Sequence, residues 1–128
     1  SEGDHQYRIA SIYYKKQNYE QALVELQILL ENYPKSSWAE ETKFKIIEIL
    51  YALNRCPEAR EQYRHFNLEY SNSRFKSEMD FVVASCLEEE GHLKDAYKRF
   101  KSLEGRYTYP AILKMKLVGI EKRIEKKR

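Results

Sequence analysis

Glycine and proline are scarce in this chain of 128 residues, which holds four glycines and three prolines. Alternating runs of β-branched residues are missing, and so is the Asn-Gly pair that typifies tight β-hairpins. These absences argue against a sheet of short strands. Helix-forming residues such as Leu, Glu, Lys, Arg, Ala and Gln dominate instead, so the composition favours an all-α fold.

Long apolar runs are also absent. No stretch approaches the roughly 20 apolar residues of a membrane span, and no signal peptide is recognisable. The sequence opens with SEGDHQ and stops inside a helix-like run, EKRIEKKR. We therefore expect a processed protein or an excised part of a longer one.

Cysteine is limited to Cys56 and Cys86, and the two form no CxxC motif. This number and spacing exclude a dense disulfide framework and a zinc-knuckle pattern. The sequence predicts two free, partly buried thiols.

Groupings of catalytic residues are missing as well. His5, His65 and His92 have no partner at metal-ligand spacing, and the glycines are isolated, which excludes a glycine-rich phosphate loop. No Ser/His/Asp or Cys/His set has the required local context. We expect no catalytic residue, no bound metal, no cofactor and no small-molecule substrate, and hence a protein that is not an enzyme.

The chain does contain a repeat with a period of 37 residues, which needs no insertion or deletion. Some positions keep one residue type in all three copies, and others keep large apolar residues. The clearest columns are Ala22, Ala59 and Ala96; Tyr33, Tyr70 and Tyr107; Leu26, Tyr63 and Phe100; and Leu29, Phe66 and Leu103. A period of 20 to 50 residues is typical of solenoids.

Each repeat holds two segments whose apolar residues recur at spacings of three and four, which predicts two amphipathic helices. Asn54 and Gly91 tolerate the left-handed conformation that ends a helix, and Pro57 suits the first turn of the next one. Such short links predict antiparallel hairpins. The expected helices span residues 4–17, 20–32, 37–53, 57–70, 74–90, 93–106 and 110–127.

These helices predict a single all-α domain over residues 1–128. Its repeats cover about 4–36, 37–73 and 74–110, and a terminal helix covers 111–127. Leu113, Leu117, Ile120 and Ile124 have core-type spacing in that helix, so it should cap the last hairpin. The alanine column should mark the closest approach of the two helices in each hairpin.

The sequence resembles the tetratricopeptide repeat family. The residues that carry the resemblance are Ala10, Tyr13, Ala22, Leu26, Leu29 and Pro34 in the first repeat, and Gly91, Ala96 and Phe100 in the third. The resemblance implies a right-handed superhelix of three hairpins that serves as a protein–protein scaffold. The long joint YPKSSWAEET is similar to the tandem repeats of bacterial cell-envelope proteins, such as outer-membrane-assembly lipoproteins and the Tol–Pal coordinator, which implies a periplasmic or envelope location; the alternative is the cytoplasm.

In this family the first helices of successive hairpins line a concave groove, which implies a partner-binding surface for a peptide segment or helix. The residues expected there are Tyr7, Ser11, Tyr14, Phe44, Glu48, Tyr51, Phe81, Ser85 and Glu88. Two other readings stay open. The aromatic rings can simply fill space between adjacent helices, and the chain can be a structural segment of a larger solenoid.

The last helix is basic, since residues 111–128 hold seven Lys or Arg against two Glu. Such a helix can contact nucleic acid or an anionic membrane surface. Its apolar residues should pack inward, however, so we do not expect nucleic acid as the partner and expect at most peripheral membrane contact. The sequence leaves the partner's identity and the oligomeric state open.

Overall fold

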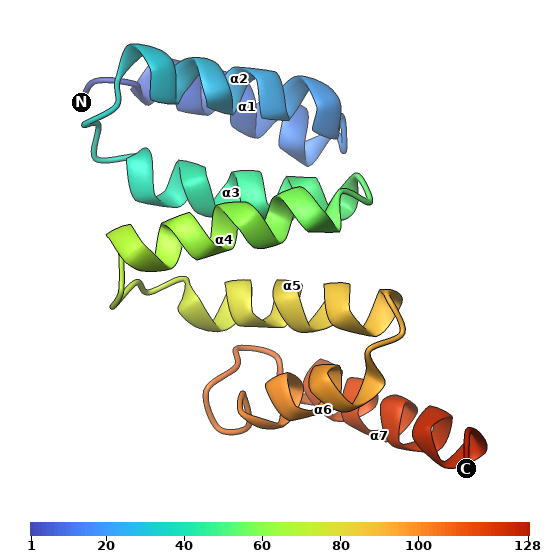
Figure 1. The fold of residues 1–128 in the computed structure, drawn as a ribbon. Helices are drawn as coiled ribbons and strands as arrows, with labels where there is room; N and C mark the ends of the chain where they lie inside the picture. The colour runs from blue at the N-terminus through green and yellow to red at the C-terminus, as the bar shows by residue number, and fades with distance from the viewer. The chain divides into compact units, whose positions relative to one another are not determined.

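The computed structural model describes all residues, 1–128, and is entirely helical. Figure 1 labels its seven helices, which follow one another without any strand. Their bounds are α1 Asp4–Lys15, α2 Tyr19–Asn32, α3 Ala39–Ala52, α4 Cys56–Glu69, α5 Lys76–Glu89, α6 Leu93–Lys101 and α7 Pro110–Lys126. None of them combines the length and the hydropathy that crossing a bilayer requires.

The chain divides into two compact units, Ser1–Ser71 and Asn72–Arg128, here called unit 1 and unit 2. Unit 1 holds the hairpins α1–α2 and α3–α4, and α2 also packs on α3. Unit 2 holds the hairpin α5–α6, with α7 packed on α6. The division lies next to the expected boundary between the second and third repeats. The single domain and the superhelix stay predictions.

The helices of each hairpin run antiparallel side by side (Figure 1), and the same turn recurs in all three hairpins. A residue with positive φ follows the first helix each time: Gln17 at 59°, Asn54 at 61° and Gly91 at 85°. The next backbone N–H then bonds to a carbonyl five residues back, as from Arg55 to Leu50 at 2.8 Å. This bond is the helix-ending Schellman pattern.

The alanine column is buried, as its small side chain predicts. Ala22, Ala59 and Ala96 are all 0% exposed, and so is the neighbouring large residue Phe100. A larger side chain at these positions would push the two helices of a hairpin apart. The sequence repeat is therefore a packing repeat.

The expected helix ends agree with the structure within two residues, except for the sixth helix. Residues 93–106 were expected there, but α6 stops at Lys101. After α6 the backbone forms turns with hydrogen bonds between residues three apart, such as Leu103 N–H to Phe100 O at 3.0 Å. Gly105 then adopts a φ of 80°. A left-handed glycine ends the helical path of the backbone, so the helix cannot extend through residue 106.

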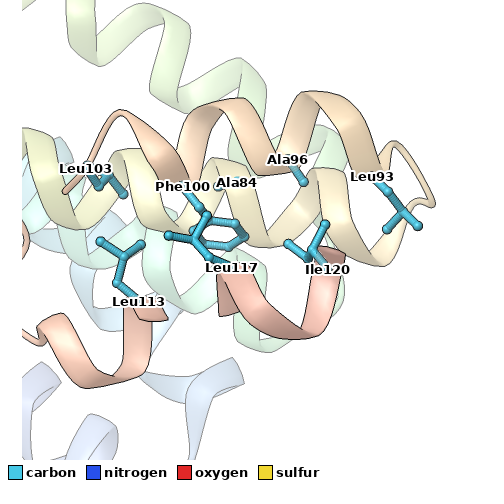
Figure 2. Close-up of a cluster of buried hydrophobic side chains, with 8 residues drawn as sticks. All are labelled: Ala84, Leu93, Ala96, Phe100, Leu103, Leu113, Leu117 and Ile120. Atoms are coloured by element: carbon cyan, nitrogen blue, oxygen red, sulfur yellow. The ribbon is translucent and has the colours of Figure 1, made fainter. Parts of the chain in front are cut away.

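The last helix caps the third hairpin, as expected. Three apolar side chains of α7, Leu113, Leu117 and Ile120, point toward α5 and α6 (Figure 2). The residues that they meet are Ala84, Leu93, Ala96, Phe100 and Leu103. This cluster is the hydrophobic core of unit 2.

The prediction of two free thiols is wrong. Neither cysteine is free, since both Cys56 and Cys86 are disulfide-bonded. Both are buried, at 6% and 0% exposure. Nothing in the sequence around either cysteine indicates this bonded state.

Candidate functional site

The first part of the expected surface lies where α1 meets the start of α3 in unit 1. The ring of Tyr7 stacks on that of Trp38, with centroids 4.0 Å apart and planes 12° from parallel. The Tyr7 hydroxyl donates to a carboxylate oxygen of Glu41, and the Trp38 indole N–H donates to Asp4 Oδ1 at 2.6 Å. Two half-exposed rings are thus held in fixed positions.

The Tyr7 hydroxyl stays protonated over a wide pH range. Burial raises its pKa, and the hydrogen bond to Glu41 and the charge of that carboxylate raise it further. The hydrogen bond to Glu41 keeps the hydroxyl end of the side chain in place, and the stack on Trp38 fixes the plane of the ring. Tyr7 therefore offers a fixed aromatic edge rather than a group for acid–base chemistry.

The second part of the surface lies about two helical turns further along α1, at Tyr14. Lys45 Nζ lies 4.6 Å from the centroid of the Tyr14 ring, a cation–π arrangement. Lys45 Nζ also lies 3.4 Å from Glu48 Oε1. The Tyr14 ring meets Tyr19 edge-on at 5.8 Å. Burial, the charge of Glu48, the neighbouring Tyr19 and a hydrogen bond with Glu48 raise the pKa of Tyr14 to about 12.

Two further residues of the expected surface are half-buried in unit 1. The Ser11 hydroxyl donates to the Tyr7 carbonyl oxygen of its own helix at 2.9 Å, so its proton is already used. Tyr51 lies near the end of α3 and is half-buried. Tyr7, Tyr14, Glu48 and Tyr51 thus keep exposed surface on α1 and α3.

Two of the expected partner-binding residues are buried, and their role in partner binding stays a prediction. Phe44 is 5% exposed and Ser85 is 2% exposed, which leaves a partner almost nothing to touch. The Ser85 hydroxyl donates to the Phe81 carbonyl oxygen at 2.8 Å and is satisfied within its own helix. For Phe44 the alternative reading, a ring that fills space between helices, describes the structure.

The remaining two expected residues, Phe81 and Glu88, are engaged inside unit 2. Phe81 stacks on Tyr107 with centroids 4.5 Å apart and meets Phe100 edge-on at 5.1 Å. Glu88 accepts hydrogen bonds from Lys116 and Arg123 of α7, both at 2.8 Å. These two residues therefore hold unit 2 together, and whether they also contact a partner stays a prediction.

Trp38, Glu41 and Lys45 also belong to this surface, although the sequence pattern did not predict them there. A signal for Glu41 was present, because Asp4, Glu41 and Glu78 form an acidic column with the period of 37. Carboxylates in the first turn stabilise a helix through its dipole. That effect alone accounts for an acidic column, so the column does not point to a hydrogen bond with Tyr7. Lys45 has no such repeat and could not have been found this way.

The grouped side chains offer aromatic faces, hydroxyl oxygens, carboxylates and one ammonium group. No cluster of three or more His, Cys, Asp or Glu side chains is placed to hold a metal ion. Such a set of groups suits recognition of a ligand by shape, apolar contact and hydrogen bonds.

A comparison with protein families matches the first hairpin of the chain. Residues 6–36, which cover most of α1 and all of α2, match a family model described as "Tetratricopeptide repeat". A search of curated proteins found no match to the chain. Repeats of this kind generally mediate protein–protein interactions and typically have no enzymatic activity. The match thus supports the resemblance to the tetratricopeptide repeat family on the hairpin that carries the Tyr7 and Tyr14 surface.

Proposed function

We propose that the chain is a non-enzymatic protein-interaction module, and that α1 and α3 of unit 1 bind a segment of a partner protein. The docking surface, here called the tyrosine surface, consists of Tyr7, Tyr14, Trp38 and Tyr51. The observation that carries the proposal is that the Tyr7 and Trp38 rings are half-exposed but held in place by a stack and two hydrogen bonds.

Rings that are already ordered lose little conformational entropy when a partner binds. Aromatic residues with a polar group combine a large apolar contact area with a hydrogen bond, and they are enriched among interface hot spots. The half-buried Tyr14 ring is ordered as well, by Lys45 and Tyr19. The tyrosine surface thus has the chemistry to hold an extended or helical peptide segment.

The test uses a displayed library of random peptides selected against the chain. Selected peptides should lose affinity by roughly 30-fold for each 2 kcal/mol of contact removed when Tyr14 or Tyr51 is changed to Ala. Tyr97→Ala is the matched control, because Tyr97 is also a half-buried tyrosine whose hydroxyl bonds a carboxylate, Glu121 Oε1 at 2.6 Å. Far-UV circular dichroism of each variant separates lost binding from lost folding.

Two results would contradict the proposal. In the first, selected peptides bind the Tyr14→Ala and Tyr51→Ala variants as well as they bind the parent chain. In the second, they bind through the Tyr97 region. Either result would favour the alternative reading, in which the chain is a structural segment of a larger solenoid and the rings only fill space.

We also propose an oxidising compartment for the chain, such as the bacterial periplasm or cell envelope. The support for this proposal is the bonded state of Cys56 and Cys86, because disulfides persist in such compartments and are rare in the cytosol. Labelling of thiols in fractionated cells tests it, and two reduced cysteines in a cytosolic fraction would favour the cytoplasmic alternative.

A further inference from the structure

Helix α7 carries apolar side chains on two opposite faces. Its inner face packs into the core through Leu113, Leu117 and Ile120 (Figure 2). Ile112, Met115 and Val118 are exposed at 47%, 74% and 41%. Their spacing of three residues places them along one side of the helix. Here these three residues and Gly119 are called the outer stripe.

The third copy of the repeat shows how such a position can be covered. Val118 lies 37 residues after Phe81, so the two occupy the same place in their helices. Phe81 is covered within unit 2 by the rings of Tyr107 and Phe100. Val118 occupies the corresponding place but is exposed. The outer stripe therefore resembles a surface that packs against other side chains, with no side chain covering it.

Gly119 lies inside α7, where glycine destabilises a helix relative to alanine. A Cβ atom added there would have nothing within 4 Å, and the residue does not adopt a positive φ. Nothing within the chain therefore requires a glycine at this position. A glycine on an exposed helix face does allow the backbone of another helix to approach closely.

The charge next to the outer stripe is mainly positive, since lysines there outnumber Glu121 and Glu125. Lys116 and Arg123 are paired with Glu88, but Lys122, Lys126 and Lys127 are exposed and form no ion pair. Lys122 and Lys126 follow Val118 at successive spacings of four residues, so they extend the same side of the helix toward its C-terminus. Lys114, beside the stripe, is likewise exposed and unpaired.

We propose that the outer stripe and its lysines bind an acidic amphipathic helix of a partner protein. The apolar side of that helix would lie on Ile112, Met115 and Val118, with its backbone close to Gly119. Its carboxylates would face Lys122 and Lys126. This surface lies entirely on α7 and does not depend on the tyrosine surface of unit 1.

Two other occupants fit the observations less well. A second copy of the chain would bring the same unpaired lysines together, and like charges across an interface disfavour association. An anionic membrane would attract the lysines as an acidic helix does, so the apolar residues of the stripe decide between the two. The stripe contains no Trp or Phe, whereas methionine, its most exposed member, is enriched at protein interfaces.

The test uses a displayed library of helical peptides with a fixed apolar stripe and flanks drawn from Asp, Glu, Lys, Gln and Ser. Selection against the chain should enrich Asp and Glu on the flanks. The double change Met115→Glu and Val118→Glu should weaken the selected peptides by at least about tenfold. Changing Lys122 and Lys126 to Glu should weaken them and reduce the salt dependence of binding.

Matched controls come from other exposed residues. Leu68, 77% exposed on α4, controls for the apolar changes as Leu68→Glu. Lys16 and Lys35 are exposed and form no ion pair, so their change to Glu controls for the lost charge. Gly119→Ala gives a further readout, because it should raise the melting temperature while weakening the peptide.

Several outcomes would overturn the proposal. Neutral or basic flanks in the selected peptides would overturn it. Peptides that bind the Met115→Glu and Val118→Glu variant as tightly as the parent chain would overturn it as well. Sedimentation with vesicles containing phosphatidylglycerol, lost in the same variant, would assign the surface to a membrane. Self-association in ultracentrifugation, lost in that variant, would assign it to a second copy.

Discussion

Trp38 stacks on Tyr7 with ring centroids 4.0 Å apart, and its indole N–H donates to Asp4 at 2.6 Å. Tyr7 and Asp4 lie three residues apart on α1, so both face the same side of that helix. Trp38 immediately precedes α3. The Trp38 side chain therefore joins the first hairpin to the second in unit 1 by two contacts.

Changing Trp38 to Ala should lower the free energy of unfolding by about 2–3 kcal/mol, since it removes both the stack and the indole bond. Trp38→Phe keeps a ring for stacking and should lose only about 1 kcal/mol, the usual value of one hydrogen bond. Urea unfolding followed by far-UV circular dichroism measures both. Equal losses in the two variants would mean that the stack contributes nothing.

Replacing Ala59 with Leu should destabilise the chain by roughly 1–3 kcal/mol through overpacking. Ala59 is 0% exposed at the contact of α3 and α4, which leaves no room for three more carbon atoms. Ala52→Leu is the matched control, because Ala52 is exposed at the end of α3. Urea unfolding should separate the two variants, and equal stability would show that the alanine column is not a close contact.

The repeat period made most of the fold predictable. Helix formation depends on residues three and four positions apart, and the link between paired helices is short, so local sequence suffices to predict the hairpins. The end of α6 was not predictable in this way. Residues 102–106 continue an amphipathic pattern, but Gly105 adopts a left-handed conformation that its residue type permits without requiring it.

The candidate site was predictable only in part, because residues in one column can have different neighbours. Tyr7, Phe44 and Phe81 occupy the same column. Tyr7 is half-exposed and bonded to Glu41, Phe44 is buried, and Phe81 lies under Tyr107. A phenylalanine has no polar group that favours exposure, so its burial depends on which side chains cover it. Which side chains cover a residue depends on the tertiary structure, and its position in the repeat does not determine this.

Cys56 and Cys86 should not react with a thiol reagent in native chain prepared without reductant, because both are disulfide-bonded. Treatment with dithiothreitol should make both reactive. Because disulfides typically contribute about 2–4 kcal/mol, the reduced chain should also unfold at lower urea concentration. Two reactive thiols in the untreated native chain would contradict the structure.

Glu88→Gln should loosen α7 from the rest of unit 2. The Glu88 carboxylate is 15% exposed and accepts from both Lys116 and Arg123, so the change leaves two cations without a partner charge. We expect a loss of about 1–2 kcal/mol that shrinks at high salt, since both partners are partly exposed. Amide hydrogen exchange should show faster exchange in α7.

The control for this prediction is Glu121→Gln. Glu121 lies on α7 itself and accepts a hydrogen bond from the Tyr97 hydroxyl, a neutral donor. An amide oxygen can accept that bond as well, so exchange in α7 should change little. Equal effects of the two variants would show that the charges at Glu88 do not hold the helix.

Tyr14 should make stability fall at high pH. Its pKa is raised from 10.0 to about 12 in the folded chain, by burial first and then by the charge of Glu48. Because the folded state holds the proton more tightly than the unfolded state, this contribution is fully present below pH 10 and is lost as the pH rises toward 12. The raised pKa of Tyr7 acts in the same direction.

Urea unfolding of the parent chain and of Tyr14→Phe, followed by circular dichroism between about pH 8 and pH 12, isolates this effect. Lysines also lose protons in this range, but they do so in both proteins, so the difference between the two curves reports Tyr14. The parent's advantage over Tyr14→Phe should be constant below pH 10 and should shrink above it, because phenylalanine has no proton to lose. A difference that stays constant up to pH 12 would mean that Tyr14 titrates alike in the folded and unfolded chains, and that its hydroxyl is not held beside Glu48.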